Sequence, residues 1–226
     1  MSFKLQTAPV ASQMAEEVLE LIKITKNPYF AALSNGQMSK EEFCASQEKF
    51  YFAVAYFSRP MAQLISRIPN PHHRLDILHN IVEEHGDFIP DKFHQTTFQK
   101  FLKTLGSDVE KVVCGNSSPA VDAFNTSLMG ICCSQPIEMG ITCLGIIEYA
   151  FAEISAFIGK SLLDRGWIAK EKLVHYNEHA DLDKEHANEF FALVEDDCEK
   201  PEIRKHITAG LELGAYIFDR LYRDLH

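Results

Sequence analysis

The sequence has little basic charge. Its 226 residues include 22 lysines and arginines against 32 aspartates and glutamates, which gives a formal net charge of −10 and a pI near 5.4. Proteins that bind a phosphate backbone usually present a clustered basic face, and no such cluster stands out in this sequence. We therefore expect no nucleic-acid partner.

Long apolar runs are also missing. The chain starts Met-Ser-Phe-Lys-Leu-Gln-Thr, without the hydrophobic region of a secretion signal. No later segment approaches the roughly 18 uninterrupted apolar residues that a membrane span requires. These features predict a soluble, cytoplasmic protein without a membrane partner.

Paired cysteine motifs are absent as well. Six cysteines occur, and none of them has the spacing of a CxxC pair. Without a secretion signal, this pattern predicts reduced thiols rather than a disulfide framework. The six are Cys44, Cys114, Cys132, Cys133, Cys143 and Cys198.

The sequence lacks the sustained alternation of β-branched and polar residues that a half-buried strand would show, and its apolar residues recur at helical spacing. With 46% hydrophobic and 24% charged residues, the chain is long enough to bury a full core. We predict an all-α protein in which residues 1–226 form a single domain, a compact bundle of seven or eight helices.

Local signals place the predicted helices. Ser39-Lys-Glu-Glu42 is a capping-box signature that opens a long helix, in which Pro60 is expected to introduce a kink. Breaks are predicted at Asn70 to His73, between Gly86 and Pro90, and at Gly166-Trp167. Helices are predicted over about residues 9–25, from 39 to 65, over 74–85, from His94 to about Leu105, from Ser118-Pro119 onward, from Pro136 to about Leu163, around the His179 to His186 segment after Gly166-Trp167, and from about Pro201 to Leu225.

Three side chains able to bind a metal follow one another in the segment from His179 to His186. His179, Asp183 and His186 occupy positions i, i+4 and i+7, which fall within roughly a 60° arc of one helix face. Non-heme iron sites use nitrogen and oxygen ligands of this kind. The spacing therefore indicates part of a metal site.

Glu148 lies in a helix that is apolar on nearly every side. Such a helix is normally buried, and an ionised carboxylate inside it is costly unless it is paired or bound to a metal. The neighbouring turns supply no partner, so we expect one from another helix. A buried salt bridge is the alternative interpretation.

A third element is Asn80-Ile-Val-Glu-Glu-His-Gly86, which is followed by His94. On one continuous helix, Glu84 and His94 would lie some 15 Å apart along the axis. A break at Gly86 and Pro90 would let Glu84 close one helix while His94 opens the next. Taken alone, the Glu-Glu-His-Gly segment could equally be a solvated helix end.

The combination is more specific than its parts. Three imidazoles and three carboxylates from separate helices are about the complement that two iron or manganese ions need. The six candidate ligands are Glu84, His94, Glu148, His179, Asp183 and His186.

These residues resemble the heme-oxygenase-like diiron oxidases, which share a TenA-like helical fold with the thiaminase-II, pyrroloquinoline-quinone-synthase and heme-oxygenase proteins. The resemblance spans roughly residues 27–190 and includes Ser34-Asn-Gly36, the Asn80 to Gly86 block, and all six candidate ligands. It implies that the six hold two iron ions, with Glu84 preferred over Glu83 because the family's asparagine aligns with Asn80. His79, His85 and His175 fall outside the family pattern and are expected at the surface.

The sequence departs from several members of this family. A chlamydial member makes para-aminobenzoate from its own tyrosine with the help of a lysine, and the aligned positions here are Phe30, Ser46 and Ile158. The thiaminase branch pairs a cysteine with a glutamate in a motif of the last helix that is absent here, which leaves Cys143 without an evident catalytic partner. N-oxygenating members use an extra helical glutamate that residues 56–60 lack.

The resemblance implies an oxidase that uses O2 as co-substrate, two iron ions or a manganese and an iron ion as cofactor, and a small organic substrate. Apolar residues near Glu148, namely Leu144, Phe151 and Ala152, suggest that this substrate has an apolar or aromatic part. Dimeric relatives imply a homodimer. Two alternatives remain open, a metal-independent enzyme or cofactor-binding protein on the same fold and a helical protein-interaction module. Heme is disfavoured because residues 1–71 contain no histidine.

Overall fold

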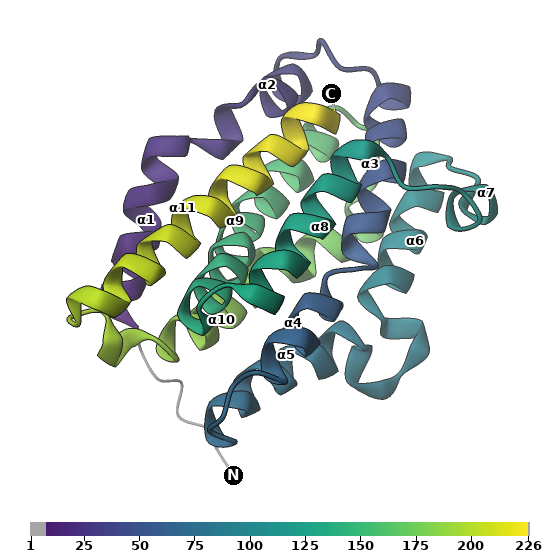
Figure 1. The fold of residues 1–226 in the computed structure, drawn as a ribbon. Helices are drawn as coiled ribbons and strands as arrows, with labels where there is room; N and C mark the ends of the chain where they lie inside the picture. The colour runs from purple at the N-terminus through teal and green to yellow at the C-terminus, as the bar shows by residue number, and fades with distance from the viewer. Residues whose placement is uncertain (1–7, 226) are drawn as a thin grey trace.

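Helices build the whole structure, a computed structural model that describes residues 8–225, with the side chains of Val174 and of 177–182 excepted. Within this range there are eleven α-helices, six short 3₁₀ turns and no strand (Figure 1). The all-α prediction is confirmed. The helices are α1 (Pro9–Ile22), α2 (Pro28–Asn35), α3 (Lys40–Val54), α4 (Ser58–Ile65), α5 (Leu75–Glu84), α6 (His94–Leu105), α7 (Val109–Val113), α8 (Pro119–Ser134), α9 (Ile137–Asp164), α10 (Val174–Ala192) and α11 (Pro201–Leu225).

The three short helices α2, α4 and α7 raise the number above the seven or eight long ones predicted. Ser39 and Glu42 form the predicted capping box at the start of α3. The long helix expected to kink at Pro60 is instead divided, because α3 ends at Val54 and α4 begins at Ser58. Pro60 then lies in the first turn of α4, where its missing N–H costs no hydrogen bond.

The longest helix, α9, runs through the middle of the bundle, with α10 and α11 packed along it (Figure 1). By length and composition alone α9 could cross a membrane, but 72% of its most apolar 18-residue window is buried inside the protein. This is the burial of a core helix, and it explains why α9 is apolar on nearly every side.

Glycines bring the backbones of these central helices close together. A Cβ atom on Gly210 of α11 would lie 2.2 Å from the Thr142 hydroxyl of α9 and 2.4 Å from the Met139 carbonyl oxygen. Thr142 donates a hydrogen bond across this contact to the carbonyl of Ile207, at 3.1 Å. On the other side of α9, a Cβ on Gly145 would lie 2.8 Å from Phe191 of α10. The backbone of α11 therefore packs directly on the backbone of α9, and the Phe190 and Phe191 side chains of α10 pack on the α9 backbone at Gly145.

The close approach of α11 to α9 at Gly210 leaves no room for even the methyl group of an alanine. Gly210→Ala should lower the free energy of unfolding by about 1–3 kcal/mol, because the added Cβ meets backbone atoms that cannot move aside. Gly130→Ala on α8 is the matched control, since nothing lies within 4 Å of its added Cβ, and it should raise stability by up to about 1 kcal/mol. Urea unfolding of both variants measures the difference; equal effects would contradict the packing described.

Candidate metal centre

Glu148 lies near the middle of α9 with only 4% of its surface exposed. Its Oε1 atom is buried and accepts no hydrogen bond from any residue that the structure describes. Burial raises the pKa of Glu148 well above its ordinary value, and the nearby carboxylates of Asp183 and Glu84 raise it further. The sequence predicts that no residue of α9 pairs with Glu148. The buried Oε1 atom of Glu148 therefore needs either a proton or a cation.

Helix α10 presents two further donors to Glu148. Asp183 and His186 are 1% and 2% exposed, and one ligand atom from each of these residues and from Glu148 lies within 4.8 Å of the other two. The donors are fixed because α9 and α10 touch at Gly145, less than one turn before Glu148. Two carboxylates and an imidazole at such separations form a donor set suited to iron or manganese.

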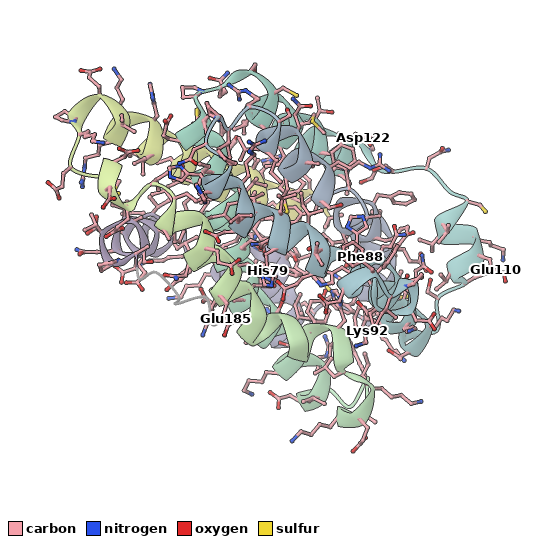
Figure 2. All side chains as sticks on the ribbon, turned by 90° about the horizontal axis from the view of Figure 1, so that it is seen from below. His79, Phe88, Lys92, Glu110, Asp122 and Glu185 are labelled. Atoms are coloured by element: carbon pink, nitrogen blue, oxygen red, sulfur yellow. The ribbon has the colours of Figure 1, made fainter. Side chains whose placement is uncertain are left out.

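A tight reversal between α5 and α6 brings in the next pair of residues. Gly86, Asp87 and Phe88 all have positive φ angles, of 55°, 54° and 65°. A Cβ on Gly86 would lie 2.5 Å from the backbone carbonyl carbon of Lys92, so glycine is required there. Figure 2 labels Phe88 and Lys92, which mark this reversal. The predicted break at Gly86 and Pro90 is confirmed.

The reversal places the last residue of α5 beside the first residue of α6. The Nδ1 atom of His94 lies 2.7 Å from Glu84 Oε1, and both side chains are largely buried. Burial by itself lowers the pKa of His94, but the charge of Glu84 and this hydrogen bond outweigh it and raise the pKa to about 9. With His94 protonated and Glu84 ionised, the two side chains form a buried ion pair.

Glu83, the residue before Glu84, contacts a different imidazole. Its Oε2 atom lies 2.5 Å from His186 Nε2. Burial raises the pKa of Glu83, whereas the hydrogen bond and charge of His186 lower it by more, and the pKa of His186 is raised in turn. Both adjacent glutamates thus turn toward the cluster, each toward its own histidine.

Other polar contacts join α5 to α10. Asn80 is 1% exposed, and its amide donates hydrogen bonds to Glu189 Oε2 at 2.6 Å and to the Asp76 carbonyl at 3.0 Å. His79 lies 3.5 Å from both Glu83 and Glu189. These contacts hold the end of α5 against α10 and so orient Glu83 and Glu84.

A small cavity of about 50 Å³ opens beside these donors. Its polar lining consists of Glu84, His94, Glu148 and His175. This volume suffices for about one or two water molecules. Phe151, expected from the sequence to face the substrate, lines the cavity, whereas Leu144 and Ala152 are buried elsewhere in the core. The apolar lining is Phe50, Ala53, Val54, Phe57, Phe124, Ile147, Phe151 and Phe218.

His175 corrects one expectation. It was predicted at the surface, but it is 1% exposed, lines the cavity, and lies with Nδ1 3.1 Å from the Thr97 hydroxyl. The reason is the packing of α10 against α6, where the His175 ring meets Phe98 edge to face at 4.9 Å. His79 is exposed as expected, and His85 is half-buried with Nδ1 2.7 Å from the Ile81 carbonyl.

The structure brings three of the six predicted ligands, Glu148, Asp183 and His186, within reach of one another, and places Glu84 and His94 on the cavity that Glu148 also lines. Glu148 and Glu84 line the same cavity, which joins the group on α10 to the pair on α5 and α6. The side chain of His179 lies outside the described residues, and its backbone belongs to α10. The sequence prediction named Glu83 only as the alternative to Glu84, gave no role to Glu189 and placed His175 at the surface. His175 continues the stripe of His179 and Asp183 by one turn toward the N-terminus, and this periodicity would have identified it.

Comparison with known proteins identifies the family of this chain. The sequence profile of a family described as iron-containing redox enzymes matches residues 45–217. Two curated relatives are 4-aminobenzoate synthases. The one from Chlamydia muridarum is 23% identical over 202 residues, covering 87% of this chain and 84% of the relative. The one from Chlamydia trachomatis is 24% identical over 192 residues and covers 82% of each chain.

Solved structures share the fold. A TenA homologue from Pseudomonas syringae has a TM-score of 0.77 at 14% identity, over 99% of this chain and 97% of that one. A CADD-like protein of unknown function from Nostoc punctiforme also has a TM-score of 0.77, at 17% identity, over 95% and 96% of the two chains. At these identities the likeness shows the TenA-like fold alone.

Because the Glu148 carboxylate is buried, replacing it by a neutral amide is expected to stabilise the metal-free protein. Because the folded-state pKa of Glu148 lies above its ordinary value of 4.5, the folded protein binds this proton more tightly, and the contribution to stability is lost as the pH rises above 4.5. In chelator-treated protein, Glu148→Gln should therefore raise the free energy of unfolding at pH 8 by about 1–3 kcal/mol. The gain should shrink toward pH 5.

Urea unfolding at both pH values measures this gain. Glu153→Gln, at an exposed position of the same helix, is the control and should change little at either pH. A Glu148→Gln variant that is less stable than the wild type at pH 8 would contradict the claim that the buried, ionised Glu148 carboxylate destabilises the metal-free protein.

Proposed function

Because the chain belongs to the family of iron-containing redox enzymes, we propose that it is an oxidase or oxygenase that uses O2 to oxidise or cleave a small organic substrate. Its cofactor would be two iron ions, or an iron and a manganese ion. The observation that supports this most strongly is the convergence of Glu148, Asp183 and His186 around a carboxylate oxygen without a hydrogen-bond partner among the described residues.

Negative charge is in excess in this cluster. Five carboxylates, those of Glu83, Glu84, Glu148, Asp183 and Glu189, lie near the imidazoles of His94 and His186. Even with both imidazoles protonated, the carboxylates outnumber the positive charges. Bound divalent cations would offset this excess.

The ligands proposed on the described side chains are Glu84, His94, Glu148, Asp183 and His186, and His179 is proposed as the sixth. Bound iron would supply the one-electron chemistry that lets O2 react with an organic molecule. Glu83 has a separate task, because it holds His186 through Nε2 and leaves the other ring nitrogen for the metal. This choice of ring nitrogen is inferred from the hydrogen bond.

Phenylalanines keep water out of this centre. Phe50, Phe151 and Phe218 line the cavity and pack on one another, with ring centroids 5.9 Å apart for Phe50 and Phe151 and 6.1 Å apart for Phe151 and Phe218. A dry, apolar wall strengthens the electrostatic interactions of the buried donors. It also directs the apolar part of a substrate toward the metal side of the cavity.

The reaction of the chlamydial relatives is not carried over. The positions aligned with their tyrosines and lysine hold Phe30, Ser46 and Ile158, all of which are buried here. A metal-independent reaction of the thiaminase type gains no support either, because Cys143 is fully buried and burial raises the pKa of its thiol well above the ordinary value. Such a thiol is not a nucleophile at neutral pH.

Metal analysis tests the proposal. After anaerobic reconstitution with Fe(II), the wild-type chain should retain two metal ions, whereas His186→Ala and Asp183→Asn should lose at least half of the bound metal because each removes a ligand. His73→Ala, at an exposed position away from the cluster, is the control and should bind as much as the wild type. A wild-type protein without iron or manganese, or unchanged metal content in His186→Ala, would refute the proposal.

A further inference from the structure

A groove on the surface leads to the back of the metal centre. It lies along α6 and the turn Lys170–Lys172 that precedes α10, and it has a volume of about 600 Å³. Phe101 and the backbone side of α6 form part of its floor, and four lysines border it, Lys92, Lys100, Lys103 and Lys172. Figure 2 labels one of the four, Lys92.

His175 is shared by the groove and the cavity. Its side chain lines both spaces, and the cavity is also lined by Glu84, His94 and Glu148. The Thr97 hydroxyl lies 3.1 Å from His175 Nδ1 and donates to the carbonyl of His94 at 3.0 Å. The His175 ring, which Thr97 of the first turn of α6 contacts, thus borders both the surface groove and the cavity of the candidate ligands.

The groove gathers four lysines with little negative charge beside them. The groove lysines form no ion pair with any residue that the structure describes, and Lys100 donates instead to the backbone carbonyl of Asp91, at 2.7 Å. Asp91 is the one carboxylate among the residues that line the groove. In a chain of net charge −10, this is a local excess of positive charge.

We propose that this groove receives the substrate, and that the substrate is an apolar, aromatic-sized molecule with one anionic head group. The lysines would bind the head group, and the apolar part would pass the position of His175 into the phenylalanine-lined cavity. Because the cavity holds only about 50 Å³, the His175 ring must turn aside to admit it. This inference rests on the proposed function, since it names the substrate class of the same centre.

Binding of a matched pair of ligands tests the groove. Calorimetry with the full chain should show that 4-phenylbutanoate binds about tenfold more tightly than 4-phenylbutan-1-ol, which has the same apolar part and no charge. The triple variant Lys100→Gln, Lys103→Gln, Lys172→Gln should remove this preference, and so should 1 M salt. A third ligand, 4-phenylbutyl phosphate, tells whether the groove favours a carboxylate or a phosphate.

A second triple variant provides the control for net charge. Lys49→Gln, Lys160→Gln, Lys205→Gln makes the same change in charge at exposed positions outside the groove, and it should keep the preference for the anion. Equal affinity for the anions and the alcohol in the wild type, or equal losses in the two triple variants, would overturn the proposal.

The position of His175 gives an independent readout. His175→Ala joins the groove to the cavity, so stopped-flow measurements should show faster association of 4-phenylbutanoate than in the wild type; an unchanged association rate would refute the proposed route. All binding measurements are made before and after iron loading. Lysine-dependent binding without metal uptake would refute the diiron function but support substrate binding in the groove. Metal uptake without a preference for the anion would refute substrate binding in the groove and leave the diiron function intact.

Discussion

The burial of one carboxylate governs the rest of this structure. Glu148 lies in the middle of a helix whose other residues form the core, and an ionised carboxylate there loses its hydration without gaining a hydrogen bond at Oε1 from the described residues. Asp183 and Glu84 increase the cost, because they bring further negative charge to the same place. His94 of α6 and His186 of α10 pair with Glu84 and Glu83 instead, so they leave Glu148 uncompensated. The arrangement is most easily understood as a site whose full compensation comes from bound cations.

Close backbone contacts hold the donors in place. Gly145 lets α10 approach α9 within one turn of Glu148, and Gly86 allows the reversal that sets Glu84 beside His94. Both contacts use positions at which a larger side chain has no room. The donors therefore lie on rigid helices whose separation is fixed by packing, which is what a preorganised metal site requires. The surface groove beside α6, in contrast, is bordered by four exposed lysines and reaches the buried His175.

The sequence was most informative where chemistry is local. The capping box at Ser39, the apolar surroundings of Glu148 and the break at Gly86 depend on residues a few positions apart, and each was predicted correctly. The roles of Glu83 and Glu84 could not be separated in this way, because the rotation of α5 against α10 decides where each points, and both meet a histidine. His175 was misplaced for the same reason, since its burial depends on contact with α6.

Mössbauer spectroscopy of protein loaded anaerobically with ⁵⁷Fe(II), before and after exposure to O2, measures how many iron ions the cluster around Glu148 holds. We expect two iron ions per chain and, after O2, ferric ions that are magnetically coupled, because Glu148, Asp183 and His186 would hold them close together. One iron per chain, or ferric iron that behaves entirely as isolated ions, would contradict it.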